Sequence, residues 1–126
     1  MLKLTNPAPN RIDILLDGPV GANEMRDGLD AFVEMASGMQ GGQILYRIPE
    51  FAMPSFEAIG IKMAQLPRLF GLFGHFSSIA VLTDSALLRT AAEIEGAVIP
   101  GIAIKAFELD EEAAAEAWLA ARAEAA

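Results

Sequence analysis

Strand-like and helix-like segments alternate along this chain, and that alternation limits its possible folds more than any other feature. Apolar runs at 43–48, 76–83 and 101–107 have the length and the glycine or proline boundaries typical of buried strands. Segments with the apolar period of a helix separate these runs. Because parallel strands need such crossovers, the pattern predicts an α/β layer with helices packed on a mostly parallel sheet.

The N-terminal residues predict two further strands. Met1–Thr5 is short and extended, Asn6–Asn10 is dense in turn residues, and the segment from Arg11 to Asp17 begins with polar and apolar residues in alternation. We therefore expect an antiparallel hairpin over residues 1–16. The whole sheet then has about five strands.

About four helices are predicted from caps, breakers and apolar periodicity. Their limits are Asn23 (as N-cap) to Gly38, Pro54–Ser55 to Pro67, Ser85 to Ile94 with Asp84 as cap and Gly96 as stop, and Asp110 onward. The residues expected to face the sheet are Met25, Leu29, Phe32, Val33 and Ala36 in the first helix, Leu87, Leu88, Ala91 and Ile94 in the third, and Ala114, Ala117, Trp118 and Ala121 in the fourth.

Composition narrows the classes of function. With 126 residues, 53% of them hydrophobic, the chain is expected to form one domain over 1–126. The absence of cysteine excludes thiol nucleophiles, disulfides and thiolate metal sites. A net charge of −8 argues against a nucleic-acid partner. Charges and prolines interrupt any export signal and no apolar run is long enough to span a membrane, so we expect a soluble, cytoplasmic protein.

The C-terminal half carries a family resemblance. The strand and turn Phe76–Asp84, a following helix, Pro100–Gly101, a strand ending at Phe107, and Glu116–Leu119 together resemble the SpoIIAA-like branch of the STAS superfamily. That branch is also described as STAS/SEC14-like, from its similarity to CRAL-TRIO lipid-binding domains. The N-terminal half agrees in the order of its elements. The resemblance implies a STAS-like fold and a binding role, and it implies no catalytic residue.

One motif of the wider superfamily is altered here. Its phosphorylatable members place an Asp-Ser pair where the central strand enters the second helix. At that junction this chain has Glu50 and then Pro54–Ser55, and no Asp precedes Ser55. The departure weakens the expectation of a phosphorylation switch at Ser55.

Polar residues should gather at one edge of the predicted sheet. Because parallel strands end along the same edge, we expect Glu50, Ser55, Thr83, Asp84 and Ser85 to lie there. They could form an anion or partner site, with Ser55 or Ser85 modified. They could equally be helix caps, because caps favour the same residue types.

Other candidate sites find little support in the sequence. His75 is the only histidine and lies in a glycine-flanked loop, so we predict no catalytic residue and no metal site built on it. No glycine-rich nucleotide motif is present, and we predict no cofactor. A Mg²⁺ site made only of carboxylates stays possible, with no spacing that favours it. The acidic run beginning at Glu108 is typical of a helix start.

The stretch from the second helix to residue 76 contains more apolar side chains than one helix face uses. Its principal members are Phe56, Ile59, Met63, Phe70 and Phe73. A homodimer partner, a bound apolar (lipid-like) molecule, or packing within the single chain could each cover them. Pro67, Gly71 and Gly74 disfavour a rigid helix. We expect Pro67–His75 to be a loosely structured flap held down by a ligand or a second subunit.

Three functional hypotheses follow. The first is a non-enzymatic binding or regulatory module, cytoplasmic and dimeric, that meets a protein partner or an apolar ligand through the second helix and its Gly/Phe-rich extension. The second is a small enzyme that uses the carboxylates of Glu50 and Asp84. The third is a phosphorylation-regulated protein that resembles the antagonists of anti-sigma factors.

Overall fold

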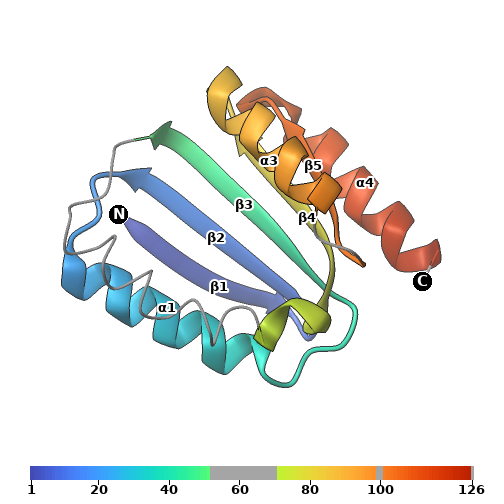
Figure 1. Ribbon diagram of the computed structural model, residues 1–126, viewed down its shortest axis with the longest axis horizontal. Coiled ribbons are helices and arrows are strands. Elements are labelled where there is room, and N and C mark those ends of the chain that lie inside the picture. Colours follow the sequence, from blue (N-terminus) through green and yellow to red (C-terminus); the bar gives the residue numbers. More distant parts are fainter. Residues whose placement is uncertain (52–70, 99–100, 126) are drawn as a thin grey trace.

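A computed structural model describes residues 1–51, 71–98 and 101–125 (Figure 1). Its five strands form one sheet in the order β1 to β5. Their bounds are Leu2–Ala8 (β1), Arg11–Gly18 (β2), Gly42–Phe51 (β3), Phe76–Thr83 (β4) and Ala103–Phe107 (β5). β1 and β2 pair antiparallel, and every later neighbouring pair is parallel. The predicted mixed α/β sheet with an N-terminal hairpin is confirmed.

Three α-helices lie wholly within the described residues. They are α1 (Ala22–Ala36), α3 (Ala86–Val98) and α4 (Glu112–Ala125), and short 3-10 turns span Phe73–His75 and Leu109–Glu111. The helix predicted from Pro54 to Pro67 lies outside the described residues. α1 and α4 lie on opposite sides of the sheet (Figure 1).

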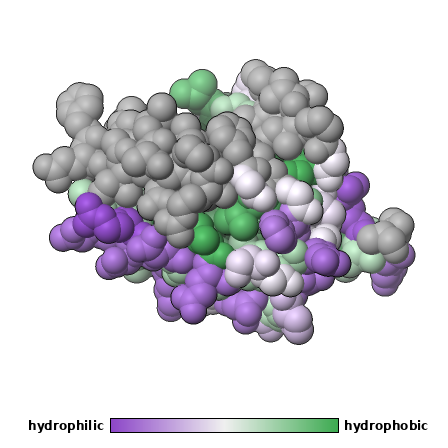
Figure 2. Space-filling view, turned by 60° about the horizontal axis from the view of Figure 1, so that its bottom comes forward, coloured by the Kyte–Doolittle hydropathy of each residue, from purple (hydrophilic) through white to green (hydrophobic). Residues whose placement is uncertain are grey.

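The inner face of the sheet, which α1 and α3 cover, contains the larger share of the core. Alternation along β2 buries Ile12 and Ile14 on this face. They join a cluster with Ala36, Met39, Ile44, Leu72, Phe76 and Ile102. α1 turns its polar residues away from the sheet, and most of the described surface in Figure 2, which brings the lower side of Figure 1 forward, is hydrophilic.

The outer face is only partly covered by α4. Ala115 and Leu119 of α4 pack on Leu45, Leu82 and Phe107, which belong to β3, β4 and β5. Over β1 and β2 the same face carries exposed Lys3 and Thr5 and half-buried Asp13 and Leu15. The outer side of the hairpin is therefore accessible to solvent.

Several predicted boundaries are wrong. The N-cap of α1 is Gly21 and not Asn23, whose Oδ1 instead accepts a hydrogen bond from Arg26. β3 continues through Pro49, where its pairing with β4 has already ended at Ile48, so no hydrogen bond to β4 is lost. α3 continues past Gly96 to Val98.

The predicted faces of two helices are only partly correct, with Leu88 and Trp118 packed against the sheet and other residues not. In α3 Leu88 faces the sheet as predicted, whereas Leu87 is 78% exposed and Ala91 is also exposed. Ala92 is buried in their place, and the side chain of Ile94 lies outside the described residues. In α4 Ala114, Ala117 and Ala121 are exposed, whereas Ala115 and Leu119 are buried. A Leu87–Leu88 pair and a run of alanines each fit more than one rotation of a helix, so only packing selects the buried face.

The segment before β4 also departs from the prediction of a loose flap where it is described. Residues 71–72 are helical and lead into the 3-10 turn at 73–75. Leu72 is only 8% exposed and belongs to the inner core. His75 Nδ1 lies 2.6 Å from the carbonyl oxygen of Met39. This part of the segment is packed by the chain itself.

Candidate functional site

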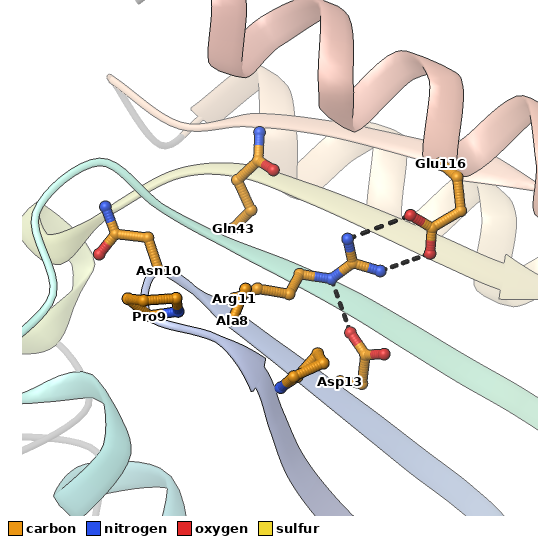
Figure 3. Close-up of a pocket in the computed structure, with 8 residues that line it drawn as sticks. Ala8, Pro9, Asn10, Arg11, Asp13, Gln43 and Glu116 are labelled. Atoms are coloured by element: carbon orange, nitrogen blue, oxygen red, sulfur yellow. Dashed lines mark hydrogen bonds and ion pairs between the residues drawn. The ribbon is translucent and has the colours of Figure 1, made fainter.

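An open groove of about 610 Å³ lies between the hairpin turn and α4 (Figure 3). The end of β1, the turn, and the start of β2 supply one wall, β3 supplies the floor, and α4 supplies the other wall. The lining residues are Pro7, Ala8, Pro9, Asn10, Arg11, Asp13, Gln43 and Glu116.

Arg11 is the centre of this groove. Its Nε donates to Asp13 Oδ1 at 2.6 Å. Its two terminal nitrogens donate to the two carboxylate oxygens of Glu116, at 2.6 and 3.2 Å. This bidentate, charge-assisted contact joins β2 to α4, and its two residues are 105 positions apart in the sequence. In Figure 3 the Glu116 side chain descends from α4 to meet the guanidinium group.

The electrostatics of Arg11 follow from its surroundings. Its side chain is 16% exposed, against 35% for Asp13 and 48% for Glu116. Burial, the largest single influence, lowers the pKa of Arg11, but the hydrogen bonds and charges of Glu116 and Asp13 outweigh burial and raise that pKa above its usual value. The guanidinium therefore stays charged and is held in one position.

Two amide side chains fix the rest of the wall. Gln43 Nε2 donates to the carbonyl oxygen of Leu119 in α4 at 2.7 Å. Asn10 Nδ2 donates to the carbonyl oxygen of Gln40 at 2.7 Å, and the backbone N–H of Gln43 donates to the carbonyl oxygen of Asn10 at 2.8 Å. The turn, β3 and α4 are thus tied together around the groove.

The lining of the groove offers groups for hydrogen bonding and for packing. None of the eight lining residues is a serine, threonine, lysine or histidine, and both carboxylates are bound to Arg11. What the groove presents is a paired guanidinium, two carboxylates, two amides and a rim of proline and alanine. This combination can hydrogen-bond and pack against a ligand without activating a nucleophile.

A smaller depression of about 230 Å³ continues across the outer face of the hairpin. It shares Asp13 with the groove and reaches Lys3, Leu15 and Arg47. Arg47 faces Glu112 of α4 at 3.5 Å, and both side chains are close to half exposed. The two depressions adjoin at Asp13 and form one surface beside α4 that mixes charged and apolar side chains.

The strand-end residues Thr83, Asp84 and Ser85 accept hydrogen bonds from backbone N–H groups, and Ser85 is the helix cap among them. Ser85 Oγ accepts the backbone N–H of Leu88 at 3.3 Å and so caps α3, the role predicted for Asp84. Asp84 Oδ1 instead accepts the backbone N–H of Leu109 at 3.0 Å. The buried Thr83 hydroxyl accepts the backbone N–H of Ser85 at 3.2 Å.

Glu50 takes no part in this cap cluster. It is exposed near the end of β3 and stands opposite Asp17 of β2. No contact among the described residues joins Glu50 to Asp84. Ser55 lies outside the described residues.

The apolar candidates cannot be placed in the site. Phe56, Ile59, Met63 and Phe70 lie outside the described residues, as does the side chain of Phe73.

Within the described ranges, no cluster of three or more histidine, aspartate or glutamate side chains is arranged to hold a metal ion. No helix in the described part of the chain has the length and apolar character needed to cross a membrane.

Sequence reasoning missed the groove. The alternation of Arg11 and Asp13 on β2 was visible, but Glu116 lies in an acidic, alanine-rich helix where one carboxylate resembles the next. Their meeting depends on how α4 crosses the sheet, for which no local signal exists.

Comparisons with known proteins agree with this architecture. An uncharacterized protein from Shewanella loihica, whose crystal structure has a SpoIIAA-like fold, superposes with a TM-score of 0.71 over 94% of this chain and 92% of its own, at 15% sequence identity. That likeness establishes the fold. No functionally curated protein matches the chain significantly. The family model described as SpoIIAA-like matches residues 11–120, and the chain belongs to this SpoIIAA-like family.

Proposed function

We propose that this protein is a non-enzymatic regulatory module that binds another protein in the cytoplasm. The observation that carries the proposal is the groove beside α4, which is open, combines charged and amide groups with an apolar rim, and is braced by the Arg11 contacts. The caps at the strand ends support it, since the hydroxyl and carboxylate groups of Ser85 and Asp84 are engaged by backbone N–H groups. A regulatory role also fits the SpoIIAA-like fold.

The fold supports two finer versions of this proposal. In one, a second copy or an apolar molecule binds the second helix and its extension, which contain Phe56, Phe70 and Phe73. In the other, phosphorylation of Ser55 or Ser85 controls binding. We favour the groove, because the contacts of Arg11 with Asp13 and Glu116 hold its walls in place.

Binding by wild-type and groove variants tests the proposal. Candidate partners found by proximity labelling in the native host are purified and titrated against the wild-type chain and against Ala8→Glu, which places a charged side chain in the groove. The matched control is Ala120→Glu, on an exposed position of α4. We expect at least one candidate to lose affinity about tenfold or more with Ala8→Glu and to be unaffected by the control. Equal binding of all candidates to both variants, or no binding by any purified candidate, would overturn the proposal.

A further inference from the structure

We propose that α4 is a releasable cover of the outer face, which undocks as a helix while the sheet stays folded. Its release uncovers a surface that fits an acidic amphipathic helix of a partner protein. This inference rests on the proposed function and adds an open form to it. With α4 docked, Glu116 forms one wall of the groove, and with α4 released the outer face itself becomes the binding surface.

The apolar attachment of α4 is small. Ala115 and Leu119 are its buried residues, and half-buried Trp118 packs against Phe107 with ring centroids 6.2 Å apart. The other alanines of α4 with described side chains, Ala113, Ala114, Ala117, Ala120, Ala121 and Ala123, are all exposed. Leu119 is therefore the one large side chain that α4 buries completely.

Polar contacts supply the rest of the attachment. Glu116 binds Arg11, Glu112 faces Arg47, and the carbonyl oxygen of Leu119 accepts from Gln43. Arg122 Nε donates to Ser78 Oγ at 2.7 Å while its guanidinium lies over the Trp118 ring. Water can replace most of these partners when the helix leaves, so the net loss for each contact is small compared with that of a buried apolar contact.

The fold allows α4 to leave without disturbing the sheet. α1 and α3 each connect two strands, whereas α4 follows the last strand, β5. The turn before it is anchored independently, because Asp84 accepts the N–H of Leu109 and a capping box joins Glu108 to Glu111. Alanine, glutamate and arginine favour the helix by themselves. Undocking therefore requires neither strand separation nor melting of α4.

The uncovered surface has a defined chemistry. Leu45, Leu82 and Phe107 form an apolar strip, and Arg11 and Arg47 border it on the hairpin side. In the closed form these two cations face Glu116 and Glu112, carboxylates four residues apart on one helix. A partner helix with an apolar stripe and two such carboxylates matches both the shape and the charge of this surface.

Hydrogen exchange measured by mass spectrometry tests the opening without any partner. In Glu116→Gln, we expect peptides of α4 to exchange about threefold faster or more, with β3 and β4 unchanged, because the lost contact favours undocking and an undocked helix of this length frays at its ends. Glu124→Gln, an exposed position on the same helix, is the control and should leave the rates as they are. If α4 and β4 exchange together in every variant, the helix opens only on global unfolding and the proposal is wrong.

A peptide tests the occupant. A labelled peptide with the sequence of residues 108–124 is titrated into the full-length Glu116→Gln chain, whose own α4 is weakened and whose Arg11 lacks its Glu116 partner. We expect saturable binding that falls about tenfold when the peptide itself carries Glu116→Gln, and not when it carries Glu124→Gln. Absence of binding would refute an acidic helix as occupant. The proposed function would be unaffected, since its groove is tested by Ala8→Glu.

Discussion

Tyr46 is the only tyrosine of the chain, and the pKa of its phenol depends on its burial in the core. It lies in β3 and packs against two groups of core residues on the inner face, one around Ile12 and Ile14 and the other made of Ile48, Val81 and Ala92. Burial disfavours the ionised phenolate and raises the pKa of Tyr46 to about 12, above its ordinary value of 10.0.

The first prediction concerns the alkaline titration of Tyr46. Because the folded chain holds the phenol proton more tightly than the unfolded chain, its stability is intact below pH 10 and falls as pH rises towards 12. The full loss is on the order of 2–3 kcal/mol. Absorbance at 295 nm should show ionisation near pH 12, and Tyr46→Phe should remove this part of the pH dependence of urea unfolding. An absorbance midpoint near pH 10 in the folded chain would contradict the prediction.

Helices show how similar residues take different roles in different elements. Asn23 and Ser85 are both good cap residues, yet only Ser85 accepts a backbone N–H at the start of its helix. Asn23 lies inside the first turn of α1, where its side chain meets Arg26.

We expect Ser85→Ala to lower the free energy of unfolding by about 1 kcal/mol, because the N–H of Leu88 loses its acceptor. Asn23→Ala is the matched comparison and should change stability by less than about 0.5 kcal/mol, as for an exposed position without a cap role. Urea unfolding of both variants measures the difference. Equal losses would mean that cap geometry does not decide the outcome.

A second prediction at this scale concerns the contact of α1 with β1. A Cβ at Gly28 would lie 2.3 Å from Leu2 Cδ2 and 3.1 Å from Leu2 Cγ. Alanine normally stabilises a helix interior by about 1 kcal/mol relative to glycine, but here Leu2 must move away from its core contacts.

Gly28→Ala should therefore give no gain in the wild-type background and a gain of about 1 kcal/mol in a Leu2→Ala background, where the clash is absent. A double-mutant cycle by urea unfolding measures this coupling. If Gly28→Ala has the same effect in both backgrounds, the close approach does not limit the packing of α1.

At the scale of the whole molecule, apolar residues that look alike in sequence separate into core and surface. Leu72 contacts a cluster drawn from β2, α1, β3 and β4, whereas Leu87 is 78% exposed on α3. The sequence predicts that Leu87 faces the sheet. It leaves open whether the chain itself or a partner covers the apolar stretch that contains Leu72.

Leu72→Ala should lower the free energy of unfolding by about 2–4 kcal/mol, through lost burial and the cavity that remains. Leu87→Ala should change it by less than about 0.5 kcal/mol. Thermal and urea unfolding of the two variants at low protein concentration measure this contrast. A loss for Leu72→Ala that appears only at concentrations where the chain associates would instead place Leu72 at an interface.

The sequence by itself determined the strands, their direction and the family. Apolar runs between glycine and proline breakers are local signals, and crossover helices force neighbouring strands to be parallel, so β3, β4 and β5 could be predicted without tertiary contacts. Only the tertiary structure decided which helix faces are buried and where the groove lies. The alanines of α4 and the Leu87–Leu88 pair allow several rotations, and packing against Leu82 and Phe107 selects one for α4. That selected rotation also brings Glu116 to Arg11, a contact between residues 105 positions apart that no local pattern encodes.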